Sequence, residues 1–357
     1  MIAAGYPKYF WPGTRRSGPC GCPDKSFSYP RKNVRGHGPL LQYGQNRLIL
    51  LFAAMVLFTP LVFTLPAWAA GKDTIAVIYP DIGAPYREIF EKIIEGIEDK
   101  VGTQVANYPV RDDTDIAELK ASLLRQNIKV VIALGRQGMK TATALNKGIK
   151  VVVGGVLTVP ENEARGLPVI SLTPDPALLF ARMKALMPSV KRVFVVYDPG
   201  YNGWLLEFAK VAARAQGLEL VAYEAHDLRS AVHFYQEIFS GADGHSDVLW
   251  LPQDSTTVED SSILPLVLQE SWNQGIAVFS SNFSHVRRGV LFSLYPDNMA
   301  LGKSLAGLAQ GILISGDYGK HDMMPLHDVQ SAVNLRTAKH LGLNPSRQQR
   351  FDMTFPE

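Results

Sequence analysis

Cysteine is almost absent from the sequence. The 357 residues contain only Cys20 and Cys22, and both precede an apolar run at residues 48–65. The chain after this run therefore holds no disulfide and no thiol. A disulfide-stapled scaffold and a cysteine-dependent enzyme are both excluded for that part of the chain.

The motifs of common catalytic sites are also missing after the run. There is no G-x-S-x-G elbow, no G-x-G-x-x-G fingerprint and no H-E-x-x-H pair. Residues 301–304 read Leu-Gly-Lys-Ser, like the tail of a phosphate-binding loop, but the leading glycine of that motif would fall at Asp297. We predict that Lys303 and Ser304 lie on a helix instead.

The histidines are scattered and do not form a metal-binding pattern. His321 and His327, six residues apart around Pro325, have a spacing that could hold a metal. Solvated loop histidines are the commoner interpretation of such a pair. We therefore predict neither a metal nor a cofactor.

Basic residues dominate the N-terminus. Residues 1–69 contain eight of the 36 Lys and Arg but only one of the 33 acids, so the rest of the chain has a formal charge of −4. Residues 1–46 are rich in Gly and Pro and cannot bury a core, which predicts a basic leader of low order. The rest shows no Lys/Arg stripe interleaved with aromatics, and we expect no nucleic-acid partner.

The apolar run itself is typical of an export signal. Arg47 precedes it, and Ala67-Trp68-Ala69 after it is the small-x-small pattern of a cleavage site. We predict a signal peptide at residues 47–69 and a periplasmic protein. A retained membrane anchor is the alternative, because the run barely reaches the length that spans a bilayer. Pro60 and Pro66 favour cleavage.

After residue 73, short runs rich in Val, Ile and Leu alternate with helical patterns, which is typical of parallel sheets covered on both faces. A looser stretch at residues 157–174 interrupts the alternation. We predict strands at residues 74–79, 104–110, 129–134, 150–156, 192–197, 219–223, 247–251, 276–280 and 289–294, and helices at residues 85–100, 114–126, 175–187, 203–216, 228–239, 263–274 and 298–314, with one more through Met139 and Ala144.

This order predicts an α/β fold of two doubly wound parallel-sheet lobes with a ligand cleft between them. Lobe 1 would consist of residues 70–174 and about 283–312, and lobe 2 of residues 175–282 and about 313–357. Each lobe is long enough to hold a core of its own.

Ligands bind such sheets at the carboxyl ends of the strands, so the loops there are the candidate site. These loops carry many hydrogen-bonding groups, but none pairs a nucleophile with a base, and we expect no enzyme activity. Capping of the following helix is the alternative role for each Asp and Asn. The candidate ligand-binding residues are Asp81, Gly135, Arg136, Gln137, Asp198, Tyr201, Asn202, Asp254, Ser255, Thr256, Ser281 and Asn282.

Four stretches in this order, residues 192–199, 247–258, 297–311 and 332–343, carry a resemblance. From about residue 75 to 343 the chain resembles the ABC-transporter substrate-binding protein family of the periplasmic-binding-protein type I fold, which includes binding proteins for tryptophan and tyrosine. The resemblance implies binding roles for residues 254–256, for Gly135 with its neighbours, and for Asp198 with Tyr201 and Asn202. Residues 79–83 depart from the family pattern, so we do not assume an aromatic amino acid as ligand.

The function predicted from these features is solute binding by hinge closure, with no covalent step. The ligand would be small, polar and amino-acid-like, and the partner an inner-membrane ABC permease; we expect a monomer. A second hypothesis is a periplasmic subunit that reports its ligand to a membrane kinase or cyclase. A two-lobed glycosyltransferase-like enzyme is the third, without a phosphate-binding glycine loop or an acid cluster to support it.

Overall fold

The computed structural model describes residues 74–84, 86–145, 148–164, 166–318, 323–345 and 350–356. They belong to a compact unit, Lys72–Glu357. The predicted leader, the signal peptide and its cleavage site lie outside the described residues. Among the helices of the described part, none has the length and apolarity needed to cross a membrane.

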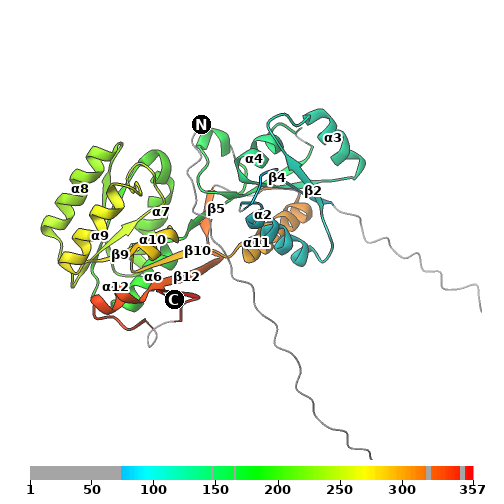
Figure 1. Cartoon of the computed structure of the whole chain (residues 1–357). Coiled ribbons are helices and arrows are strands. Elements are labelled where there is room, and N and C mark those ends of the chain that lie inside the picture. The colour runs from blue at the N-terminus through cyan, green and yellow to red at the C-terminus, as the bar shows by residue number, and fades with distance from the viewer. Residues whose placement is uncertain are drawn as a thin grey trace, which may run out of the picture. The chain divides into compact units, whose positions relative to one another are not determined.

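The first sheet has six strands in the order β11-β5-β4-β3-β1-β2, all parallel (Figure 1). Its strands are β1 (Ile75–Pro80), β2 (Ala106–Val110), β3 (Val130–Leu134), β4 (Lys150–Val156), β5 (Val169–Pro174) and β11 (Met323–Leu326). Its helices are α2 (Tyr86–Val101), α3 (Ile116–Arg125), α4 (Gly135–Thr143), α5 (Glu161–Ala164) and α11 (Asn298–Ser315).

Both faces of this sheet are buried. Along β1, Ile75 and Val77 belong to the core under α2 and α11, whereas Ala76 and Ile78 belong to the core under α3 and α4. Alternate residues of a strand point to opposite faces, so a strand covered on both sides must be apolar throughout. This is why the sequence shows short continuous apolar runs instead of alternation.

The second sheet has seven strands in the order β13-β12-β10-β9-β8-β6-β7, and only the β10–β12 pair is antiparallel among its described pairs. Its strands are β6 (Arg192–Tyr197), β7 (Glu219–Glu224), β8 (Asp247–Leu251), β9 (Ala277–Ser280), β10 (Phe292–Pro296), β12 (Val329–Asn334) and β13 (Met353–Phe355). Its helices are α6 (Pro176–Leu186), α7 (Pro199–Ala215), α8 (Leu228–Gly241), α9 (Ile263–Gln274), α10 (Ser284–Arg288) and α12 (Leu335–His340).

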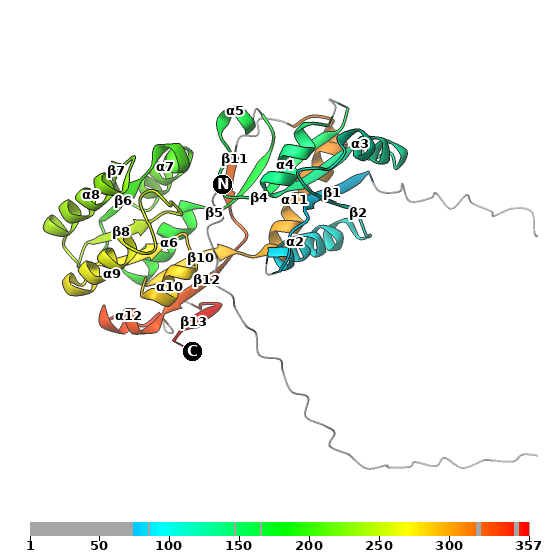
Figure 2. The ribbon, with the colours of Figure 1, turned by 45° about the horizontal axis from the view of Figure 1, so that its top comes forward.

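This sheet also separates two cores. Val193 and Val195 of β6 pack in the cluster of α6 and α7, whereas Phe194 and Val196 pack in the cluster of α8 and α9. Figure 2 shows α8 and α9 together beside this sheet, and α2 beside α11 in the first lobe. The predicted pair of doubly wound α/β lobes is confirmed.

The chain passes between the two sheets three times: from β5 into α6, from β10 into α11, and from β11 into β12. The three connections are hydrogen-bonded to one another. The backbone N–H of Asp175 donates to Leu326 O (2.9 Å), and that of Asp297 donates to Asp328 O (2.9 Å). Ser304 of α11 donates to the Asp328 carboxylate at 2.5 Å. The lobes are therefore joined by a bundle of three adjacent segments.

Three predictions about this architecture are corrected. The looser stretch at residues 157–174 ends in a regular strand, β5, which was missed because Pro168 and Pro174 flank a half-buried segment. Residues 283–296 were placed in lobe 1, but α10 and β10 belong to the second lobe, where β10 pairs with β9 and β12. The chain returns to the first lobe at α11. Residues from about 313 onward were placed in lobe 2, but β11 pairs with β5 in the first sheet, so the second lobe resumes only at β12 and is completed by α12 and β13.

Candidate functional site

Asp254 joins the loops at the carboxyl ends of β6 and β8. It is buried, and its carboxylate accepts four hydrogen bonds from the protein. One oxygen accepts from the N–H of Thr256 (2.9 Å) and Thr257 (3.2 Å). The other accepts from the N–H of Asp198 (2.7 Å) and from the Asn202 side chain (3.1 Å). A carboxylate has about four lone-pair positions, so Asp254 is fully used inside the lobe.

The predicted loop at residues 198–202 is in fact the start of α7. Asp198 caps the helix by accepting from the N–H of Gly200 at 2.8 Å, and Pro199 occupies its first turn. Asn202 is buried against Asp254, while Tyr201 is 46% exposed. Of the three residues predicted here, Tyr201 alone presents its side chain outward.

Ser255 and Thr256 follow Asp254 in an irregular segment, and Ser255 is exposed. The next residue, Thr257, is buried and donates to Val196 O of β6 at 3.2 Å. The same oxygen-rich loop therefore has one side tied to the sheet and one side open to solvent.

Ser281 and Asn282 also make structural contacts at the end of β9. Ser281 is buried and accepts from the indole N–H of Trp250 at 3.0 Å. Asn282 precedes α10, and its side-chain oxygen accepts from the N–H and hydroxyl of Ser284, at 3.0 and 2.9 Å. Trp250 is fully buried.

One pairing of a nucleophile type with a base was missed. Ser280 Oγ lies 2.9 Å from His285 Nδ1, and His285 Nε2 lies 3.2 Å from Asp260 Oδ1. The serine, histidine and carboxylate have the connectivity of a hydrolytic triad. However, Ser280 is fully buried and its oxygen also accepts from the N–H of Asn282. No substrate can reach this hydroxyl, so the array is a structural network under the loop.

Burial lowers the pKa of His285 from 6.5 to about 4, although Asp260 opposes the shift. In the unfolded chain the histidine binds a proton near pH 6.5, so between pH 6.5 and 4 the unfolded state holds more protons. The stability that neutral His285 supplies is therefore present above pH 6.5 and is lost as the pH falls through 4. We expect the free energy of unfolding to drop by on the order of 3 kcal/mol over this range from this group.

Urea unfolding from pH 7.5 to pH 4 in wild type and His285→Gln measures this contribution, because the other titrating groups are common to both proteins. The variant should be less stable at neutral pH and should lose less stability on acidification. Parallel pH profiles for the two proteins would contradict the assignment.

In the first lobe, Asp81 follows β1 and is held by two arginines. Arg111 Nε donates to one carboxylate oxygen at 2.7 Å, and Arg87 lies 3.4 Å from the other. The carboxylate is about a quarter exposed, while both guanidinium groups are mostly exposed. Arg111, which is not among the twelve candidate residues, thus joins Asp81 in one charged group at the strand ends.

Gly135 directly follows β3 and is the first residue of α4, so no loop separates the two elements. Its φ of +69° requires glycine, and a Cβ there would lie 3.3 Å from Phe90 and Pro80. A Cβ at Gly155 of β4 would likewise lie 3.3 Å from the Gly135 nitrogen. The segment 135–138, predicted as a loop, is the first turn of α4, and no side chain caps it.

Arg136 and Gln137 lie in that first turn. Arg136 is exposed and lies 3.2 Å from Glu163 of α5, and Gln137 is half-buried. Ligand contact by any of the twelve predicted residues stays a prediction. The structure distinguishes those whose polar atoms are already used within a lobe, such as Asp254, Asn202 and Ser281, from those that face solvent, such as Tyr201, Ser255 and Arg136.

No cluster of three or more metal-ligating side chains occurs among the described residues. His327 lies 3.3 Å from Asp175 at the crossing between the lobes, and His321 is outside the described part. Lys303 and Ser304 lie on α11, as predicted, where Lys303 pairs with Asp99 at 2.7 Å. The resemblance of residues 301–304 to a phosphate-binding loop is therefore coincidental.

Two parallel-sheet α/β lobes joined by three crossings define the periplasmic-binding-protein type I fold. Residues 92–348 match the family model described as ABC transporter substrate binding protein, and the chain belongs to this family. The family relationship predicted from the sequence is confirmed.

The chain is also similar to solved structures. A ligand-free, open substrate binding protein from Clostridium difficile is 16% identical, with a TM-score of 0.54, over 78% of this chain and 99% of its own. A conserved domain protein from Vibrio cholerae is 20% identical, with a TM-score of 0.47, over 79% of this chain and 99% of its own. No curated protein matches the chain.

Proposed function

We propose that the protein is an extracytoplasmic solute-binding protein of an ABC uptake system that closes its two lobes around a small, polar, amino-acid-like ligand. Membership in the substrate-binding family carries this proposal. The proposed route begins with export through the signal at residues 47–69 and cleavage after Ala69 or Ala70, which makes the mature protein periplasmic. An inner-membrane permease would then receive the ligand from a monomer.

The three crossings support closure as the working motion. Each lobe has its own two cores, so each can move as a rigid body. The segments between them are short and are linked by the hydrogen bonds of Asp175, Asp297 and Asp328. Hinge closure needs only a few residues at element ends to change their dihedral angles. The ligand would favour the closed form by contacting both lobes.

The exposed groups at the strand ends suggest how an amino-acid-like ligand would be held. In the first lobe, the uncapped N–H groups at the start of α4 and the side chain of Arg136 suit a carboxylate. In the second lobe, Tyr201 and Ser255 suit hydroxyl or ammonium groups. Asp254 would act indirectly, because its hydrogen bonds fix the two segments that carry Tyr201 and Ser255.

A thermal-shift screen of amino acids, sugars and purines tests the proposal. A ligand at a hundredfold excess over its dissociation constant adds about 2.7 kcal/mol of stability. For a mature chain of this size that raises the melting temperature by about 4 to 5 °C. Arg136→Gln should weaken the binding of an anionic ligand about tenfold without changing the melting temperature of the free protein.

The screen requires protein that was unfolded and refolded to remove any ligand that co-purifies. Arg125→Gln, which changes an exposed arginine in the last turn of α3, serves as the control. If no compound stabilises such protein at millimolar concentration, solute binding is not its function.

A further inference from the structure

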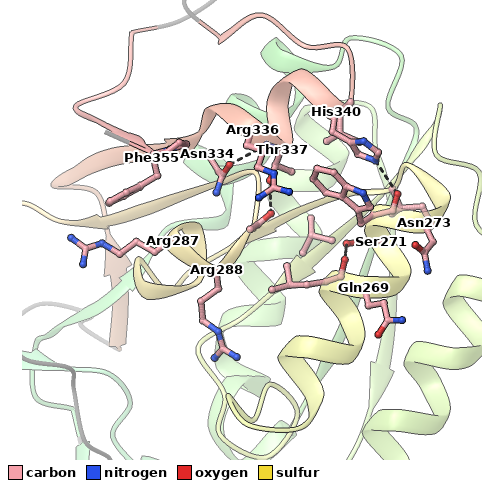
Figure 3. A pocket seen from close by; sticks show the side chains of 17 residues that line it. Gln269, Ser271, Asn273, Arg287, Arg288, Asn334, Arg336, Thr337, His340 and Phe355 are labelled. Carbon is pink, nitrogen blue, oxygen red and sulfur yellow. Dashed lines mark hydrogen bonds between the residues drawn. The ribbon is translucent and has the colours of Figure 1, made fainter.

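A pocket of about 570 Å³ lies in the second lobe between α9, α10, α12 and the C-terminal strand β13 (Figure 3). Its volume falls within the range of small-molecule sites. None of the twelve residues predicted to bind the solute lines it. It is therefore separate from the candidate site at the strand ends.

An aromatic wall is already ordered on one side of the pocket. The rings of Trp272 and His340 stack at a centroid distance of 3.7 Å with 7° between their planes. His340 Nε2 lies 2.9 Å from Trp272 O, which fixes the imidazole against the indole. The Arg336 guanidinium lies over the Trp272 ring at 5.6 Å. Trp272 remains 39% exposed, so part of its surface faces solvent.

The charge of the pocket is of one sign. Arg287, Arg288 and Arg336 line it, and the described lining contains no Asp or Glu. Arg288 is anchored by Asp260, outside the lining, at 3.3 Å and by a 2.6 Å hydrogen bond to Asp260 O. Figure 3 shows Arg336 near His340, whereas the side chains of Arg287 and Arg288 extend away from these two residues. Leu268, Ile276 and Val278 supply the apolar lining.

Guanidinium groups recognise carboxylate and phosphate through paired N–H donors, and they also stack on flat rings. An exposed indole beside them offers a surface for a planar apolar body. We propose that this pocket is a second binding site of the protein, for a small molecule that joins an anionic group to an aromatic ring. The anion would meet Arg336, whose guanidinium lies over the Trp272 ring, and the ligand's ring would lie against the exposed part of Trp272 and the apolar lining.

Phenyl phosphate is a suitable probe, and benzyl alcohol is its neutral counterpart. Isothermal titration calorimetry on the full mature protein should give one saturable site for phenyl phosphate with a dissociation constant at or below about 1 mM. Benzyl alcohol should bind at least tenfold more weakly. Tryptophan fluorescence should change on binding, and the change should be absent in Trp272→Leu.

Arg336→Gln should weaken the binding of phenyl phosphate about tenfold, since it removes a charge-assisted contact. Arg336 is exposed, so the variant should keep its circular dichroism spectrum and melting temperature. Arg214→Gln, an exposed arginine on α7 of the same lobe that does not line the pocket, should bind like wild type.

Equal affinity for the neutral probe, equal losses in Arg336→Gln and Arg214→Gln, or no saturation up to about 10 mM would each overturn the proposal. Failure here would leave the proposed solute binding intact, because the two sites share no residue. The thermal-shift screen gives a separate result, since a ligand of the strand-end site is recognised by its weaker binding to Arg136→Gln, and Arg136 does not line this pocket.

Discussion

Gly302→Ala is expected to destabilise the protein by about 2 to 3 kcal/mol, although the same change in most helices stabilises. Gly302 lies on α11 where this helix crosses α2. A Cβ at position 302 would overlap the Ile93 carbonyl oxygen and would lie 2.9 Å from the Ile97 nitrogen. These are backbone atoms of the facing helix and cannot rotate away. The two helices would have to separate.

The contact is reciprocal, which strengthens the expectation. A Cβ at Gly96 of α2 would overlap the Met299 carbonyl oxygen of α11. The two glycines therefore let the helix backbones touch over one turn. Around this contact Ile93, Ile97 and Leu305 form part of the core beneath the first sheet. Separation of the helices would open that core, and the loss adds to the steric cost.

Gly311→Ala is the matched control on the same helix. Its Cβ would meet nothing within 4 Å, and the residue is exposed. Alanine there should stabilise by about 0.5 to 1 kcal/mol through helix propensity. Urea unfolding followed by circular dichroism gives both values. If the two variants shifted the midpoint in the same direction, the close approach of α2 and α11 would be wrong.

Much of the first-order architecture can be predicted from the sequence, because strands buried on both faces must be apolar. The segments of β6 and β8 have the bounds expected from their runs of apolar residues. The strand β5 could not be predicted in the same way, since its half-buried positions and the prolines near its two ends are also typical of a loop. The antiparallel strand β12 depends on its partner β10 and has no local signal.

The candidate site was harder to predict, and helix starts explain part of the difficulty. Pro199 and Gly200 favour a turn when read alone, yet proline is common in the first turn of a helix. The segment therefore belongs to α7, and Asn202 points into the lobe. In the same way Gly135 was expected in a loop, but its positive φ lets α4 begin directly after β3.

The role of Asp254 illustrates what no local pattern can supply. Its partners Asp198 and Asn202 are more than fifty residues away in the chain. The sequence shows an Asp-Ser-Thr-Thr segment after a buried strand, which suits a ligand loop and a capped turn equally well. Only the fold brings four donors to the same carboxylate. The contact with a ligand and the structural role therefore need separate measurements.

Asp254→Ala is expected to lower the free energy of unfolding by about 3 to 5 kcal/mol, because it leaves four buried donors without an acceptor. Asp254→Asn should cost nearly as much. Its amide NH₂ would take the position of one carboxylate oxygen and would face either Asn202 with Asp198 or the N–H groups of Thr256 and Thr257. Ser255→Ala, on the exposed neighbour, should change the free energy of unfolding by less than about 0.5 kcal/mol.

A double-mutant cycle with Asn202→Ala distinguishes a structural role of Asp254 from a ligand-binding role. If Asp254 and Asn202 stabilise the lobe together, the cycle measured by urea unfolding should show a coupling of at least about 1 kcal/mol. A residue whose main partner is the solute would show little coupling and would instead lose affinity in proteins of unchanged stability. Since both oxygens of Asp254 are occupied, we expect the large effect in the unfolding experiment, with the loss of affinity in Ser255→Ala and Tyr201→Ala. Weak coupling together with a loss of affinity in the Asp254 variants would instead indicate that Asp254 contacts the ligand directly.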